Sequence, residues 1–257
     1  LSSFIGRILA DAYSLVFGLT PWVLFFLLYA AAECLRNKSF KLENKIIFYF
    51  IIFIIFYYIA STVNYVTATV RYQILLYPLA SIIAAIGLYE FINVEKIKKY
   101  TSFPLAAGIL IIFSSLSLYS IKPFYLAYAS DLLPRQNVLN LKGMGDGSFE
   151  ASQYLNALPE PEKLTIWSDK GAVCESFRGR CIVGFAKKDL LGVPFDYFVA
   201  SADRKKRSLS MSRPLKNYFD FEKLYTTDQG SVYDLKIGGR ENNFVRITGA
   251  QEIFLSK

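Results

Sequence analysis

Residues 46–70 read IIFYFIIFIIFYYIASTVNYVTATV and contain no Asp, Glu, Lys or Arg. A charge-free stretch of this length can cross the hydrocarbon core of a bilayer, about 30 Å thick, as an α-helix. Lipid offers no partners to backbone N–H and C=O groups, so a helix is the form that such a segment takes. Three further charge-free stretches precede Lys122, and they occupy residues 12–32, 72–89 and 100–121.

The sequence changes character near Lys122, because the residues after it have the mixed composition of a water-soluble domain. Residues 1–121 contain 9 basic and 5 acidic residues, and residues 122–257 contain 20 and 16. We therefore predict a small α/β domain over residues 122–257, preceded by a membrane α-helical region over residues 1–121. The four transmembrane helices of the membrane region are expected near residues 12–32, 46–64, 72–90 and 101–121.

Basic residues gather in alternate loops of the helical region. Seven lie in the loops after the first and third predicted spans, whereas the loop after the second contains only Arg71. Because cytoplasmic loops are enriched in Lys and Arg, we expect the loops after the first and third spans to be cytoplasmic. The chain is then a multi-pass protein of the cell (inner or plasma) membrane. The same rule makes residues 122–257 extracytoplasmic. The seven basic residues are Arg36, Lys38, Lys41, Lys45, Lys96, Lys98 and Lys99.

Two cysteines in the outer domain agree with this topology. Cys174 and Cys181 bracket six residues, and a disulfide between them would close a short, hairpin-like loop in an oxidising compartment. The alternative is two free thiols. The chain contains no His, and a single isolated cysteine pair does not suit zinc, so we expect no metal site.

The outer domain has one basic run, Arg204-Lys205-Lys206-Arg207. It is short and has no interleaved aromatic residues, so it does not indicate nucleic-acid binding. We interpret it as a solvated turn or a contact to anionic lipid headgroups.

Local patterns predict the elements of the outer domain. A helix is expected over residues 148–158, with Asp146 as its N-cap and Pro159 as its stop. The spacing Gly143/Gly145/Gly147 does not fit the dinucleotide-binding fingerprint and is interpreted as a tight turn before that helix. Five β-like runs follow, at residues 163–167, 195–199, 223–226, 231–237 and 244–247.

Two passages resemble a known family. Thr69-Val70-Arg71-Tyr72-Gln73, followed by Pro78, is similar to the start of a late transmembrane helix in GT-C type glycosyltransferases that use polyprenyl-phosphate sugars. That group includes the aminoarabinose transferase of lipid A and the protein O-mannosyltransferases. Gly143-Met144-Gly145-Asp146-Gly147, running into the helix after it, is similar to a turn and helix in the C-terminal extracytoplasmic domain of bacterial members.

The resemblance implies a donor, an acceptor and a lipid-phosphate site. The donor would be a polyprenyl-phosphate-linked sugar, the acceptor an extracytoplasmic glycan, lipid or protein, and no further cofactor is implied. Arg71 would bind the lipid phosphate bidentately, with a hydrogen bond from Tyr72. The general-base carboxylate of this family lies upstream of Leu1, so we expect the chain to be the C-terminal part of a longer enzyme.

Two other functions remain open. In the first, the chain is a non-enzymatic, membrane-anchored extracytoplasmic binding or assembly module, and Arg71 only reaches lipid headgroups as an anchor. In the second, it is part of a transporter, which the lack of charges within the predicted spans disfavours.

Overall fold

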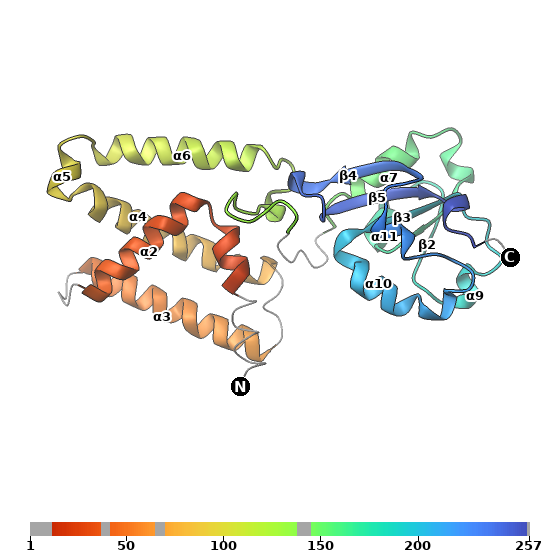
Figure 1. Ribbon diagram of the computed structural model, residues 1–257, viewed down its shortest axis with the longest axis horizontal. Helices are drawn as coiled ribbons and strands as arrows, with labels where there is room; N and C mark the ends of the chain where they lie inside the picture. Colours follow the sequence, from red (N-terminus) through yellow and green to blue (C-terminus); the bar gives the residue numbers. More distant parts are fainter. Residues whose placement is uncertain (1–11, 37–41, 65–69, 138–144, 256–257) are drawn as a thin grey trace. The chain divides into compact units, whose positions relative to one another are not determined.

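The computed structural model describes residues 12–36, 42–64, 70–137 and 145–255 (Figure 1). The chain divides into two compact units, residues 1–141 and residues 142–257, which are described separately. The unit boundary therefore lies about 20 residues after the predicted one. The segment after Lys122 folds onto the first unit, because the Ser130 N–H donates to the Phe17 carbonyl at 2.7 Å and Ala127 and Tyr128 are buried.

The first unit is helical. A short helix over Ala12–Gly18 is followed by α2 (Pro21–Arg36), α3 (Leu42–Val63), the 3-10 turn η1 (Val70–Gln73), α4 (Leu76–Ile92), α5 (Glu95–Lys98), α6 (Phe103–Tyr119) and the 3-10 turn η2 (Tyr125–Ala127). The apolar composition of the four longer segments favours helices wherever no Gly, Pro or turn interrupts them.

The prediction of four transmembrane helices is wrong. Among the described residues only one helix, Asn44–Val63 within α3, is long and apolar enough to cross a membrane. The first charge-free stretch is broken near Pro21, where Ala12–Gly18 and α2 meet at 117°, so this pair is at most one broken span. The other two stretches give α4 and α6, which have 17 residues each. At 1.5 Å per residue such a helix is about 26 Å long, short of the roughly 30 Å core.

The charge-free stretches are longer than the helices that form within them, because the stretches also contain turns. The third stretch spends its first residues in η1 and the turn after it, so α4 begins only at Leu76. The fourth stretch begins its helix at Phe103, next to Pro104, a residue suited to the first turn of a helix. A window without charges does not distinguish these turns from helix.

Helices α2 and α4 form the best-packed pair of the first unit. A Cβ on Gly87 of α4 would lie 2.2 Å from the carbonyl oxygen of Phe26 in α2, so only glycine permits this approach. Around it lie two buried apolar clusters, one of Phe26, Ala84, Leu88 and Ile92 and the other of Ala30, Ile47 and Ile83.

Much of the remaining apolar surface in this unit is exposed. No residue of α6 is buried, and α3 exposes a series of large side chains that includes Phe48, Phe53 and Phe56. Apolar faces of this extent mark a surface that contacts lipid or another protein.

The second unit is a five-stranded mixed sheet covered by helices, with strand order β2-β1-β3-β5-β4. Strand β1 is parallel to β2 and β3, whereas β5 is antiparallel to β3 and β4. The strands are β1 (Thr165–Ser168), β2 (Arg180–Val183), β3 (Tyr197–Ser201), β4 (Ser231–Lys236) and β5 (Phe244–Gly249). The helices are α7 (Ser148–Asn156), α8 (Gly171–Ser176), α9 (Lys187–Leu190), α10 (Lys205–Met211) and α11 (Lys223–Thr226). Short 3-10 turns occupy Pro161–Lys163, Ala202–Arg204 (η4), Arg213–Leu215, Ile237–Gly239 and Ala250–Glu252.

Helices cover both faces of this sheet, with α7 and α10 on opposite sides in Figure 1. The pairing Trp167↔Phe198 directs both aromatic rings to one face, where they join Phe221 and Leu224 in the main core cluster. Ile166 and Val199 alternate to the other face, as the two-residue period of a strand requires. There a Cβ on Gly147, at the start of α7, would lie 2.7 Å from Val245.

Three local predictions for this unit are wrong. Residues 223–226 form helix α11 and not a strand. The cap of α7 is Gly147 at φ 75°, without a side-chain hydrogen bond, so Asp146 is not the N-cap. The segment between the cysteines is not a hairpin, because it begins with the last two residues of helix α8, Glu175 and Ser176, and leads into strand β2.

Candidate functional site

The predicted lipid-phosphate residues lie in η1, between α3 and α4. The Tyr57 hydroxyl of α3 donates to the Tyr72 carbonyl, and the Tyr58 hydroxyl donates to Gln73 Oε1 at 3.4 Å. The ring of Tyr72 is exposed. Arg71 is part of the same turn, while its side chain lies outside the described part of the structure. The turn that holds Arg71 is thus fixed to α3 by two tyrosines.

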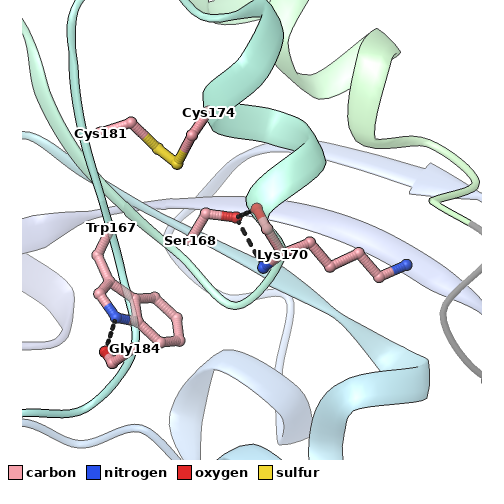
Figure 2. The surroundings of a disulfide bond; sticks show 6 residues. All are labelled: Trp167, Ser168, Lys170, Cys174, Cys181 and Gly184. Atoms are coloured by element: carbon pink, nitrogen blue, oxygen red, sulfur yellow. Dashed lines mark hydrogen bonds between the residues drawn. A yellow bond between two sulfur atoms is a disulfide. The ribbon is translucent and has the colours of Figure 1, made fainter.

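The two predicted disulfide residues are joined. Cys174 on α8 is bonded to Cys181 on β2, with 5.3 Å between their Cα atoms. Figure 2 shows the bridge on the α8 side of the sheet, while the Trp167 ring points to the opposite side. The bond fixes α8 against β2, the edge strand of the sheet.

A cluster that the sequence analysis did not find lies at the carboxyl ends of β1 and β3. The two strands are parallel neighbours; β1 leads into Asp169 and β3 leads into η4. The chain passes from β1 through α8 to β2, which pairs with one edge of β1, whereas β3 pairs with the other edge. In open α/β sheets, ligands bind outside the carboxyl ends of strands at such a switch point.

Asp169 is the central group of this cluster. Its Oδ2 accepts hydrogen bonds from the Ser201 backbone N–H at 2.7 Å and from the Tyr225 hydroxyl at 2.9 Å. Its Oδ1 is buried and has no hydrogen-bond partner among the described residues. Burial raises the pKa of Asp169 to about 7, against the lowering effect of those two hydrogen bonds and of Lys170. Such a carboxyl group can give or take a proton near neutral pH.

Lys170, the next residue, forms a buried ion pair. Its Nζ lies 3.0 Å from Asp203 Oδ1, and the two side chains are 7% and 10% exposed. Its backbone is held by Ser168, whose Oγ accepts from the Lys170 N–H at 3.1 Å and donates to the Lys170 carbonyl at 3.0 Å (Figure 2). Burial also raises the pKa of Asp146, which the charge of Lys170 lowers in part.

A pocket of about 230 Å³ opens beside Asp169. Two arginines, Arg204 in η4 and Arg207 in α10, contribute to its wall, and neither forms an ion pair among the described residues. The Arg204 Nε is buried and has no hydrogen-bond partner there. The rest of the wall consists of Gly171, Val183, Gly184, Phe185, Ser208 and Met211.

The part of the pocket wall formed by the connection after β2 is held in place by Trp167. The Trp167 indole N–H donates to the Gly184 carbonyl at 2.7 Å, as Figure 2 shows, and the Trp167 ring packs at 5.1 Å from that of Phe185. Gly184 has φ 104°, a conformation that glycine adopts readily. A buried tryptophan therefore sets the position of two pocket-lining residues.

The sequence contained one signal for this site. The basic run at residues 204–207 is not a free turn, since it ends η4 and forms the first turn of α10. Arg204 and Arg207 line the pocket, whereas Lys205 and Lys206 are exposed and do not. Nothing in the spacing of Asp169 and Tyr225, 56 residues apart, indicates that they meet.

Comparisons with models of protein families, with curated proteins and with solved structures give no match for this chain. Among the described residues, no three His, Cys, Asp or Glu side chains are grouped so that they could hold a metal ion. The site is therefore defined by its own geometry, a carboxyl group and two arginines around a small pocket.

Proposed function

We propose that the chain is the C-terminal part of a membrane glycosyltransferase that moves a sugar from a polyprenyl-phosphate donor to an extracytoplasmic acceptor. In this function Arg71 binds the lipid phosphate and neutralises the charge that develops on it as the sugar departs. The helical unit contacts the membrane through α3.

The observation that carries the proposal is the attachment of η1 to α3. Helix α3 is the described helix that is able to cross a bilayer, and Tyr57 and Tyr58 in its second half hold the turn that contains Arg71. Lys45 stands at the opposite end of that helix, the end expected to be cytoplasmic. Arg71 then belongs to the outer boundary, at the level of lipid phosphates. An arginine at such a boundary is a functional candidate.

The disulfide supports the outer location of the second unit. Bonds such as Cys174–Cys181 persist in oxidising compartments and are rare in the cytosol. A domain outside the membrane is available to an extracytoplasmic acceptor.

The test is sugar transfer by the protein expressed from its own gene and purified from membranes. Labelled polyprenyl-phosphate sugar is the donor, and Arg71→Ala is compared with the unaltered protein. We expect a loss of about 10²–10³-fold in kcat, by analogy with the removal of one charge-stabilising donor. Arg71→Lys keeps the charge but not the planar fork, so its loss is expected to be smaller.

The matched control is Arg36→Ala. Arg36 is an exposed arginine at the end of α2 that pairs with Glu33 at 2.9 Å, and its replacement is expected to leave transfer unchanged. Transfer at the normal rate by a folded Arg71→Ala protein would show that Arg71 is not the phosphate site.

A second candidate function is a membrane-anchored extracytoplasmic binding module without enzymatic activity. The pocket beside Asp169 favours it, because that pocket is built entirely from the second unit. The two functions differ in one requirement. Replacement of Arg71 abolishes the activity of a transferase and leaves ligand binding by a module intact.

A further inference from the structure

The pocket beside Asp169 offers groups of opposite chemistry that the fold itself does not satisfy. Asp169 Oδ1 and Arg204 Nε are both buried, and neither has a hydrogen-bond partner among the described residues. Buried polar atoms in folded proteins nearly always have partners, so two unpartnered atoms on residues of one pocket distinguish this wall from the rest of the fold. Elsewhere in the cluster, Asp169 Oδ2 accepts two hydrogen bonds and Lys170 pairs with Asp203.

The charge of the pocket favours an anion. Arg204 and Arg207 together contribute two guanidinium groups without ion pairs among the described residues, against the one carboxyl group of Asp169. A guanidinium presents its N–H donors in a planar fork that suits carboxylate and phosphate oxygens. Asp169 has a pKa of about 7, because it is buried, so its repulsion of an anion at neutral pH is reduced.

The size of the pocket favours a small molecule. About 230 Å³ lies below the range of roughly 300–1,000 Å³ that is usual for drug-sized ligands. A single sugar ring is of suitable size for this volume. The half-buried Phe185 and the exposed Met211 supply an apolar surface on which the C–H groups of such a ring can pack.

We propose that this pocket binds an acidic monosaccharide, whose carboxylate or phosphate pairs with Arg204 and Arg207 while its ring packs against Phe185 and Met211. The assignment does not depend on Arg71 or on sugar transfer. It applies equally to a glycosyltransferase and to a binding module, since every group that it uses belongs to the second unit.

Equilibrium binding to the full chain in detergent micelles tests the proposal, with glucuronate and glucose 6-phosphate as probes. Glucose, which has the hydroxyls alone, and inorganic phosphate, which has the anion alone, are the comparison ligands. We expect both acidic sugars to bind at least tenfold more tightly than either comparison ligand, as measured by titration calorimetry. The stronger of the two acidic probes identifies whether the anionic group is a carboxylate or a phosphate.

The variants separate the pocket from general electrostatics. Arg204→Gln with Arg207→Gln removes two positive charges that line the pocket, and Lys205→Gln with Lys206→Gln removes two exposed charges between them. We expect the first pair to weaken binding of the acidic sugars at least tenfold and the second to change it less than twofold. Arg207→Glu alone is a further test at an exposed position, and we expect it to weaken binding of the acidic sugars at least tenfold.

Several outcomes would overturn the proposal. Equal losses in the two double variants would mean attraction by net charge and not a site. Equal binding of phosphate and of the acidic sugars would remove the role of the sugar ring, and the absence of binding by any probe would remove the site altogether. Because none of these measurements involves a lipid donor, their failure is distinguishable from a failure of the Arg71 assay.

Discussion

Lys170 Nζ lies 3.0 Å from Asp203 Oδ1 in a part of the second unit that is almost closed to solvent. The pair joins Lys170, the second residue after β1, to η4, the turn after β3. It therefore holds together the two strand ends that flank the candidate pocket.

Removal of the lysine charge should destabilise the second unit strongly. In Lys170→Met the buried Asp203 carboxylate loses its facing cation, and a loss of about 3–5 kcal/mol is expected for a broken buried pair. Lys163→Met is the control, because its pair with Glu160 is exposed and worth about 0–1 kcal/mol. Hydrogen exchange at the amides of β1 and β3 in the full chain measures both. Equal protection in the two variants would contradict a structural role for Lys170.

Stability should depend on pH through Asp169. Its folded pKa of about 7 lies above the ordinary value of 3.8, so the folded state holds the proton more tightly than the unfolded state. The resulting stabilisation is complete below about pH 4 and is lost as the pH rises through about 7. In Asp169→Asn this loss should disappear, and urea denaturation between pH 4 and 8 checks it. Parallel pH profiles for the two proteins would assign the effect to another group.

The disulfide should stabilise the second unit through its loop. Cys174 and Cys181 are 7 residues apart, and closure of so short a loop in the unfolded chain corresponds to about 2–3 kcal/mol. Replacement of both by serine should lower the denaturation midpoint of this unit accordingly. Cys34→Ser, which removes a free thiol, should leave that midpoint unchanged. A reducing agent should act on the unaltered protein and not on the double variant.

Gly147 should not tolerate a side chain. It has φ 75°, and an added Cβ would lie 2.7 Å from Val245 Cγ2, so Gly147→Ala combines backbone strain with a clash. A destabilisation of about 2 kcal/mol or more is expected from the two effects. Gly171→Ala is the matched change, because nothing lies within 4 Å of its added Cβ, and it should be neutral or slightly stabilising. Thermal denaturation of both variants tests the difference.

Much of the second unit is predictable from its sequence, because alternation and turn residues act locally. Residues 163–167, 195–199, 231–237 and 244–247 overlap β1, β3, β4 and β5. Strand β2 was not predicted, because its four residues begin with an arginine and a cysteine and have no alternating pattern. Lys223-Leu224-Tyr225-Thr226 looks like a strand but is a single helical turn, where Leu224 and Tyr225 are buried in the core cluster.

The first unit and the site are less predictable, for a different physical reason. Apolar composition identifies residues that avoid water but does not specify where helices begin, so the predicted spans included turns near Pro21 and Leu76. The cluster around Asp169 depends on residues brought together by strand order. Sequence spacing contains no information about that order.

The hydrogen bond from the Trp167 indole to Gly184 has a spectroscopic consequence. The chain contains 2 tryptophans, and Trp22 is 48% exposed while Trp167 is 0% exposed. Replacing Trp22 with Phe leaves one tryptophan, whose ring packs against Phe185 in the pocket wall. Its emission then reports directly on that wall, so the protein contains a built-in optical probe of its own candidate site and needs no attached dye.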